Sequence, residues 1–148
     1  MDVYVRNFIR ASLFWLGTGV LLGVWMALAS DALIYRPAHV HANLLGFVSM
    51  MIFGVAYHVI PRFSGAPLRS PRLALAHFWI ANTGLALLVA GWLSRPWTPS
   101  IGSTALGVGA IASATGAFLF IGNIWRTLDA AAAPLPVARS VAPGGGAR

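Results

Sequence analysis

The sequence contains no cysteine, no lysine and no glutamate, and its only acidic residues are Asp2, Asp31 and Asp129. Without cysteine, the chain cannot form disulfides or thiolate metal sites, and it cannot attach haem covalently through a C-x-x-C-H motif. Hydrolase chemistry has little support, because no Ser-His-acid constellation or phosphate-binding glycine loop accompanies these few acids. Charged residues make up only 9% of the chain, against about a quarter in a typical soluble domain. The composition therefore excludes an ordinary water-soluble domain.

Apolar residues occur instead in long runs, amounting to 58% of the 148 residues, with a mean hydropathy of +0.77. A helix needs roughly 20 apolar residues to cross a bilayer. Four segments meet that length, namely residues 8–29, 38–60, 73–93 and 101–124. The first run is long and has no clear cleavage site, so we expect it to be retained rather than removed as a signal peptide. The sequence predicts an all-α integral membrane domain, residues 1–129, with four transmembrane helices.

The positive charges indicate how the chain lies in the membrane. Ten arginines give a net charge of +7 and cluster at the ends of the apolar runs, which favours a membrane partner over nucleic acid. If the N-terminus is cytoplasmic, only Arg36 and Arg95 lie outside. Those inside are Arg6, Arg10, Arg62, Arg69, Arg72, Arg126, Arg139 and Arg148. We therefore predict a bacterial inner-membrane protein with both termini cytoplasmic. Residues 130–148, rich in Ala, Pro and Gly, should form a disordered cytoplasmic tail.

Two of the four histidines, His39 and His41, lie two residues apart near the outer end of the second predicted span. An ionisable residue in a span indicates function by default, and the neutral imidazole is both the affordable form and the ligating form. A helix turns about 100° per residue, so the two side chains point about 200° apart. They cannot bind one metal together from a straight helix. They can serve two sites, one on each side, and a second ligand for either site requires another copy or another subunit.

The other two histidines, His58 and His77, fall near the cytoplasmic ends of the second and third spans. A short loop joins those spans, so the two side chains could meet within one protomer. We nevertheless expect interfacial or packing roles for both, because the headgroup region can solvate histidines at helix ends. Asn43, Asn82 and Asn123 are expected to form hydrogen bonds between helices rather than to bind a metal.

The second span with its flanks reads AHVHANLLGFVSMMIFGVAYHVIPRFSG from Ala38 to Gly65. This stretch resembles the tenth helix of the catalytic subunit of haem-copper oxidases, which begins with an Ala-His-x-His motif. That helix carries Gly, His and Pro at the offsets of Gly54, His58 and Pro61, and it ends in Phe-Ser-Gly. The stretch is also similar to the second helix of the nitric oxide reductase large subunit. The resemblance implies that the four spans correspond to one four-helix arc of such a catalytic subunit.

The same resemblance implies roles for individual residues. His39 and His41 match the two histidines that ligate two different haems in the oxidases, so we expect both to be axial ligands of haem b iron. Arg95 lies where the family places arginines near haem propionates, and Arg36 is a second, positional candidate. Because the family's three arcs are related by pseudo-threefold symmetry, the resemblance also implies a homotrimer. Each interface would hold one haem b between His39 of one protomer and His41 of its neighbour.

Several functions remain open from the sequence. The first is a membrane haem b protein that transfers electrons or binds nitric oxide or oxygen near the periplasmic face, with a respiratory-chain redox partner. The second is a cofactor-poor accessory or assembly subunit of a respiratory complex. A copper site at His39 and His41 is a third reading, against which the lack of a Met- or Cys-rich ligand set argues. The family's copper ligands have no counterpart here, so we do not expect this chain alone to reduce oxygen to water.

Overall fold

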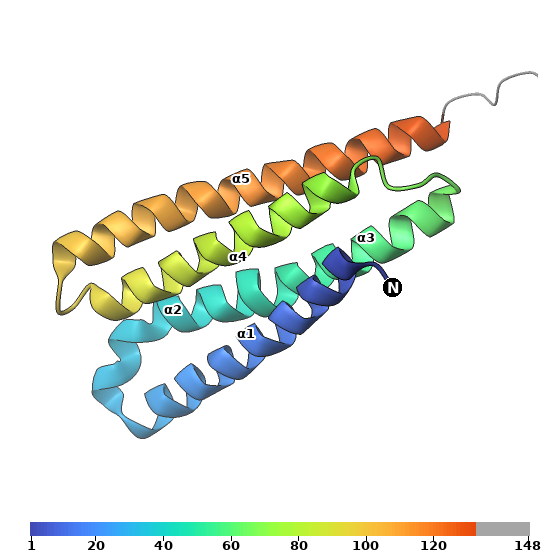
Figure 1. The fold of residues 1–148 in the computed structure, drawn as a ribbon. Coiled ribbons are helices and arrows are strands. Elements are labelled where there is room, and N and C mark those ends of the chain that lie inside the picture. Colours follow the sequence, from blue (N-terminus) through green and yellow to red (C-terminus); the bar gives the residue numbers. More distant parts are fainter. Residues whose placement is uncertain (133–148) are drawn as a thin grey trace, which may run out of the picture.

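The computed structural model describes residues 1–132, which form helices joined by short connections and contain no β-strand (Figure 1). Four helical segments are long and apolar enough to cross a bilayer, which confirms the predicted all-α membrane fold with four spans. Residues 130–132 belong to the last helix rather than to the predicted tail. The remainder of that tail, 133–148, lies outside the described residues.

The first span is α1, Val3–Leu28, and it begins before the apolar run predicted at residues 8–29. Its first turns carry Arg6 and Arg10, both exposed, so the helix continues beyond its most apolar stretch. α1 ends at Ala29, where the backbone becomes extended at φ −133°. A 3₁₀-helix, η1 (Ser30–Tyr35), then leads the chain into the second span.

The second span is one continuous helical rod with a change of helix type inside it. It consists of α2 (Arg36–His41), a π-helix η2 (Ala42–Ser49) and α3 (Met50–Ser64). The rod is longer than the predicted 38–60, because the helix continues past Pro61 and ends only at Gly65. There the backbone adopts φ +70°, a left-handed conformation that glycine tolerates and that often ends helices.

The third and fourth spans form a hairpin of α4 (Pro71–Ser94) and α5 (Pro99–Ala132). α4 begins with a cap, since the Ser70 hydroxyl oxygen accepts a hydrogen bond from the Leu73 amide at 3.2 Å. Prolines at the first turn of both helices fit positions where no backbone donor is needed. α5 extends well past its predicted end at residue 124.

The C-terminal part of α5 holds the connection between α3 and α4. The Asn123 side-chain oxygen accepts from the Ser70 amide at 3.1 Å, and its nitrogen donates to the Ser70 carbonyl at 2.9 Å. One turn later, the Thr127 hydroxyl accepts from the Arg69 amide at 3.0 Å. Asn123 and Thr127 are fully buried. Their polar groups therefore satisfy backbone groups of the α3–α4 loop.

α1, the α2–α3 rod, α4 and α5 lie side by side in sequence order, as one four-helix arc (Figure 1). α1 packs mainly on η2 and α3, whereas α4 packs along α5. Small residues let that last pair approach closely: a Cβ added at Gly84 would lie 2.6 Å from the Ser113 amide nitrogen. One end of the arc carries η1 and the α4–α5 turn, and we call it the η1 end. The other end carries Met1 and the α3–α4 loop, and we call it the N-terminal end.

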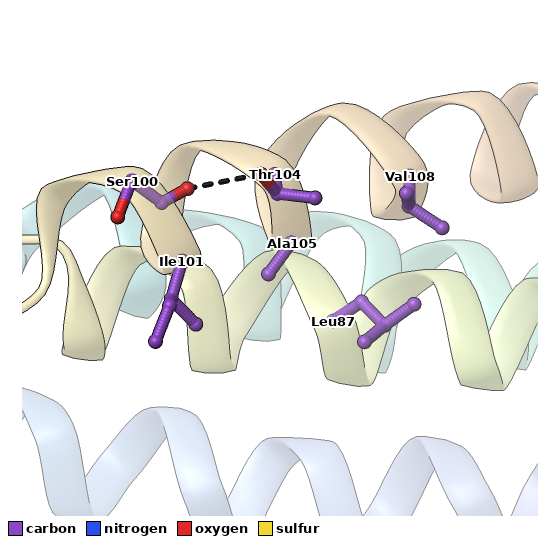
Figure 2. A pocket seen from close by; sticks show the side chains of 6 residues that line it. All are labelled: Leu87, Ser100, Ile101, Thr104, Ala105 and Val108. Atoms are coloured by element: carbon purple, nitrogen blue, oxygen red, sulfur yellow. Dashed lines mark hydrogen bonds between the residues drawn. The ribbon is translucent and has the colours of Figure 1, made fainter.

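Much of the outward surface is apolar. On α5, Ile111 and Phe118 are both 72% exposed in the isolated chain, which fits a helix that contacts lipid. An open hollow of about 440 Å³ lies between α4 and α5 near the η1 end (Figure 2). Its lining consists of Leu87, Ser100, Ile101, Thr104, Ala105 and Val108. It has no titratable side chain, and an apolar groove of this kind suits a lipid chain or a neighbouring helix.

Candidate functional site

The two histidines of the H-x-H motif lie on α2, just after Pro37 in the first turn. His39 Nδ1 is 2.8 Å from the Gly19 carbonyl oxygen of α1, and His41 Nδ1 is 2.7 Å from the Pro37 carbonyl oxygen. A carbonyl oxygen can only accept, so both Nδ1 atoms carry the proton. Each neutral ring therefore keeps an Nε2 lone pair. This arrangement, with one nitrogen donating to a carbonyl, is typical of histidines that bind metals.

The structure places the two imidazoles on opposite sides of α2, as the spacing predicts. His39 faces α1, where it bonds to Gly19 and lies close to Gly23. His41 faces α4, with its ring centroid 6.4 Å from that of Trp92. Both histidines are half-buried. The two imidazoles of one chain therefore lie at separate positions at the η1 end.

Asn43 supports His39 on the α1 side. Its side-chain nitrogen donates to the His39 carbonyl oxygen at 2.9 Å and lies 3.4 Å from each ring nitrogen of His39. The close approach of the two helices at Gly19 encloses this side chain, because a Cβ there would collide with it. The sequence predicts that Asn43 links helices, whereas its hydrogen bond is to its own helix. The Asn43 side chain packs against the His39 ring and restrains its orientation.

Trp92 joins two of the residues singled out from the sequence. Its indole ring lies beside His41, and the Arg95 guanidinium carbon is 5.4 Å from the ring centroid, within cation–π range. The structure thus brings His41 and Arg95 to the same side of the arc. Arg36 is exposed in the first turn of α2, three residues before His39. Sequence reasoning missed Trp92, although its spacing of three from Arg95 on one helix face was available as a signal.

The π-helix η2 begins directly after His41 and was not predicted. The wider winding agrees with a side-chain hydrogen bond that spans five residues: the Ser49 hydroxyl donates to the Leu44 carbonyl oxygen at 2.8 Å. π-helical turns within α-helices often occur at functional sites. Hydropathy carries no signal for this change of winding, so the sequence pattern could not reveal it.

His58 and His77 have different surroundings and do not form a pair. His58 Nδ1 lies 2.9 Å from the Arg62 guanidinium, one turn along α3. His77 is fully buried on α4, and its Nδ1 lies 3.1 Å from the Tyr57 hydroxyl. His77 Nε2 has no hydrogen-bond partner among the described residues. The sequence predicts an interfacial or packing role for both histidines. His77 is packed in the core, where headgroups cannot solvate it, and His58 is half-buried near the end of α3.

Residues 1–132 contain no group of three or more His, Cys, Asp or Glu side chains that could hold a bare metal ion. A haem needs less from the protein, since the porphyrin supplies four of the iron ligands and histidine the axial ones. The donor set at the η1 end fits that requirement, because in both His39 and His41 Nε2 is the ring nitrogen without the proton, although the Asn43 side-chain nitrogen lies 3.4 Å from that of His39.

The long apolar helices, their arrangement as an arc and the two histidines define a helical membrane protein with two imidazoles directed to opposite sides of one span. This chain belongs to the family described as cytochrome c and quinol oxidase polypeptide I, whose family model matches residues 3–140. That match confirms the likeness to the catalytic subunits of haem-copper oxidases.

Individual relatives support the same family. The chain is 33% identical over 97 residues to a cbb3-type cytochrome c oxidase subunit of Stutzerimonas stutzeri, covering 61% of this chain and 20% of that protein. It is 38% identical over 64 residues to cytochrome c oxidase subunit 1 of Rhodobacter capsulatus, covering 43% and 11%. It is also 38% identical over 61 residues to a nitric oxide reductase subunit of the same Stutzerimonas species, covering 39% and 12%.

The chain thus spans between a tenth and a fifth of the length of these relatives. No solved structure matches it. Four membrane-spanning helices together with bacterial oxidase relatives support a location in a bacterial inner membrane.

Proposed function

We propose that this chain binds haem b near the periplasmic face of the membrane, with iron ligated by His39 and His41 from adjacent protomers. The observation that carries the proposal is that the His39 and His41 rings make the same kind of hydrogen bond and carry the proton on the same nitrogen. In each, Nδ1 donates to a backbone carbonyl and leaves Nε2 as a lone pair for a metal. Membership of the oxidase family supports haem over other cofactors.

The opposite directions of the two imidazoles are the reason to invoke more than one protomer. Since His39 faces α1 and His41 faces α4, one helix cannot place both on one iron. The remaining histidines, His58 and His77, lie toward the N-terminal end. A bis-histidine haem at the η1 end therefore needs a second chain. We propose a homotrimer, by analogy with the three arcs of the family's catalytic subunit.

Arginines at the same end would neutralise the haem propionates. Arg95 is held against Trp92, beside His41, and its guanidinium can make paired hydrogen bonds with a carboxylate. Arg36 lies one turn before His39 and is exposed. Each histidine thus has an arginine close to it on the same side of the membrane.

Haem held by two histidines transfers electrons, whereas haem with one histidine displaced binds nitric oxide or oxygen. This chain's contribution is to orient the imidazoles, to restrain His39 through Asn43 and to surround the site with apolar helices. A respiratory-chain protein is the redox partner that we propose. Because the relatives are subunits of oxidases and reductases, an accessory or assembly role in such a complex is the second candidate, favoured by the exposed apolar face of α5.

The test is an absorption spectrum of protein purified in detergent, combined with its mass in solution. We expect a bis-histidine haem b spectrum and an oligomeric mass. His39→Ala and His41→Ala should each abolish stoichiometric haem retention, whereas His58→Ala, a half-buried histidine at the other end, should retain it. Haem lost in His58→Ala and kept in His41→Ala would move the site to the N-terminal end. A monomer with a bis-histidine spectrum would exclude ligation between protomers, and a folded protein without haem would favour the accessory role.

A further inference from the structure

A second hollow at the η1 end has no part in the proposed haem site. It encloses about 310 Å³ and is lined by Trp25, Asp31, Ile34, Tyr35, Pro96 and Trp97. Its three aromatic rings come from three different segments, which are α1, η1 and the turn between α4 and α5. The fold has therefore gathered residues that are distant in the sequence around one small space.

Contacts between the rings fix their positions. The Trp25 and Tyr35 rings are stacked, with centroids 4.8 Å apart and planes inclined by 22°. The Trp97 indole nitrogen donates to the Tyr35 hydroxyl oxygen at 3.1 Å. Tyr35 is 6% exposed, whereas Trp25 and Trp97 are 44% and 78% exposed. Tyr35 is thus a buried anchor that holds two indoles with accessible surface beside the hollow.

Asp31 is the one charged side chain that lines this hollow, and Arg36 and Arg95 adjoin the lining residues Tyr35 and Pro96 in the sequence. Asp31 is the only acidic residue at the η1 end, since Asp2 and Asp129 both lie toward the N-terminal end. No arginine lines the space. Aromatic faces attract cations, and a carboxylate at the edge adds a full negative charge. A purely apolar ligand would cover the Asp31 carboxylate without compensating for its lost water.

We propose that this hollow binds a quaternary ammonium group. Such a cation is bulky and weakly hydrated, and aromatic cages recognise it through the electron-rich faces of tryptophan and tyrosine. A metal ion is a poorer fit, because one carboxylate is the only anionic ligand present. The same chemistry occurs in a choline-type phospholipid headgroup and in free choline, and the position of the hollow at a helix end suits either source.

The simpler explanation is an aromatic belt, in which tryptophan and tyrosine anchor a helix end at the membrane interface. A belt requires neither an acidic residue nor rings that converge on one space. The two explanations differ in a measurable way, since a belt does not distinguish a cation from an uncharged molecule of the same shape.

The first experiment uses the full chain in a maltoside detergent and follows the methyl protons of choline by saturation-transfer NMR. The probe for comparison is the carbon isostere of choline, in which a tert-butyl group replaces trimethylammonium. We expect saturation of choline and little or none of the isostere. Equal saturation of both probes, or of neither, would overturn the proposal.

Variants then locate the binding. Asp31→Asn and Trp97→Leu should each weaken choline affinity by about threefold to tenfold, the range expected for a partly exposed cation–π or ion-pair contact. Trp79→Leu is the matched control, because Trp79 is 62% exposed on α4 and does not line the hollow. Circular dichroism checks that all three variants remain folded. Unchanged affinity in both Asp31→Asn and Trp97→Leu would place the binding elsewhere and overturn the proposal.

Mass spectrometry of the protein released from nanodiscs identifies the source of the group. Retention of phosphatidylcholine over phosphatidylglycerol, reduced in Asp31→Asn, would identify a lipid headgroup. Choline binding without such retention would identify a soluble ligand. Neither choline binding nor lipid retention depends on haem. These expectations therefore stand even if the protein is found to bind no haem.

Discussion

The Tyr57 hydroxyl lies 3.1 Å from His77 Nδ1, and this bond links the second and third spans inside a cluster of aromatic rings. The His77 ring lies 4.8 Å from Phe8 on α1, 4.7 Å from Phe53 on α3 and 5.7 Å from Phe120 on α5, measured between centroids. All four spans therefore contribute to the surroundings of one imidazole. A polar pair thus lies inside a cluster of aromatic rings near the N-terminal end.

Removal of the Tyr57 hydroxyl should destabilise the protein. Tyr57→Phe leaves His77 Nδ1 buried without a partner, in addition to Nε2, which already has none among the described residues. A buried polar group that loses its partner costs about 1–3 kcal/mol. We expect a lower midpoint of thermal unfolding in detergent, measured by circular dichroism.

Two further variants separate this effect from general damage. Tyr4→Phe makes the same chemical change at a half-buried position and should alter the free energy of unfolding by about 0.5 kcal/mol or less. The double variant Tyr57→Phe, His77→Phe removes both polar partners and should recover part of the stability. A double variant less stable than Tyr57→Phe alone would show that His77 contributes by another route.

Two glycines on α5 should respond differently to substitution by alanine. A Cβ at Gly109 would lie 2.7 Å from the Gly84 carbonyl oxygen, and a Cβ at Gly107 would meet nothing within 4 Å. Gly109→Ala should therefore push α4 and α5 apart and cost about 1–3 kcal/mol, as overpacking does. Gly107→Ala is the matched control and should be tolerated. Equal unfolding midpoints for the two variants would contradict the close packing of this hairpin.

The proposed role of Arg95 predicts a change in redox potential. Loss of a positive charge near the haem stabilises the oxidised iron, so Arg95→Gln should lower the midpoint potential, by tens of millivolts. Potentiometric titration of the haem absorption measures this shift. Arg10→Gln removes a charge from the first turns of α1, at the N-terminal end, and should leave the potential unchanged. A shift in Arg10→Gln of equal size would indicate a general charge effect rather than a propionate contact.

The absence of cysteine allows a direct test of orientation. We expect the η1 end to be periplasmic, so a cysteine at Ser100 should react with a membrane-impermeant maleimide in intact spheroplasts. A cysteine at Pro67, in the α3–α4 loop, should react only after the membrane is permeabilised. Both positions are exposed in the structure. The reverse labelling pattern would invert the topology and place His39 and His41 on the cytoplasmic side.

The sequence was sufficient to predict the number of membrane spans, their apolar segments and the opposite directions of His39 and His41. Length, hydropathy and helical periodicity determine these features locally. Helix ends were predicted less well, because they depend on contacts. α5 continues to Ala132, and near its C-terminal end Asn123 and Thr127 bond to the backbone of the α3–α4 loop, contacts that hydropathy does not reveal.

Contacts between segments that are distant in the sequence could not be predicted from the sequence. The meeting of His41 and Arg95 at Trp92 depends on how α2 packs against α4. The hollow around Tyr35 depends on a contact between η1 and the turn after α4. In each case the residue types were visible in the sequence, whereas their proximity results from helix packing.

The π-helix η2 has a consequence for how the second span can vary. A π-turn takes up one more residue than an α-turn, so α3 is rotated relative to an unbroken continuation of α2. The rod can therefore aim His39 and His41 at one set of neighbours, and Phe53 and Tyr57 at another. The directions of the two histidines at one end and the core packing at the other can thus differ from those of an unbroken α-helix.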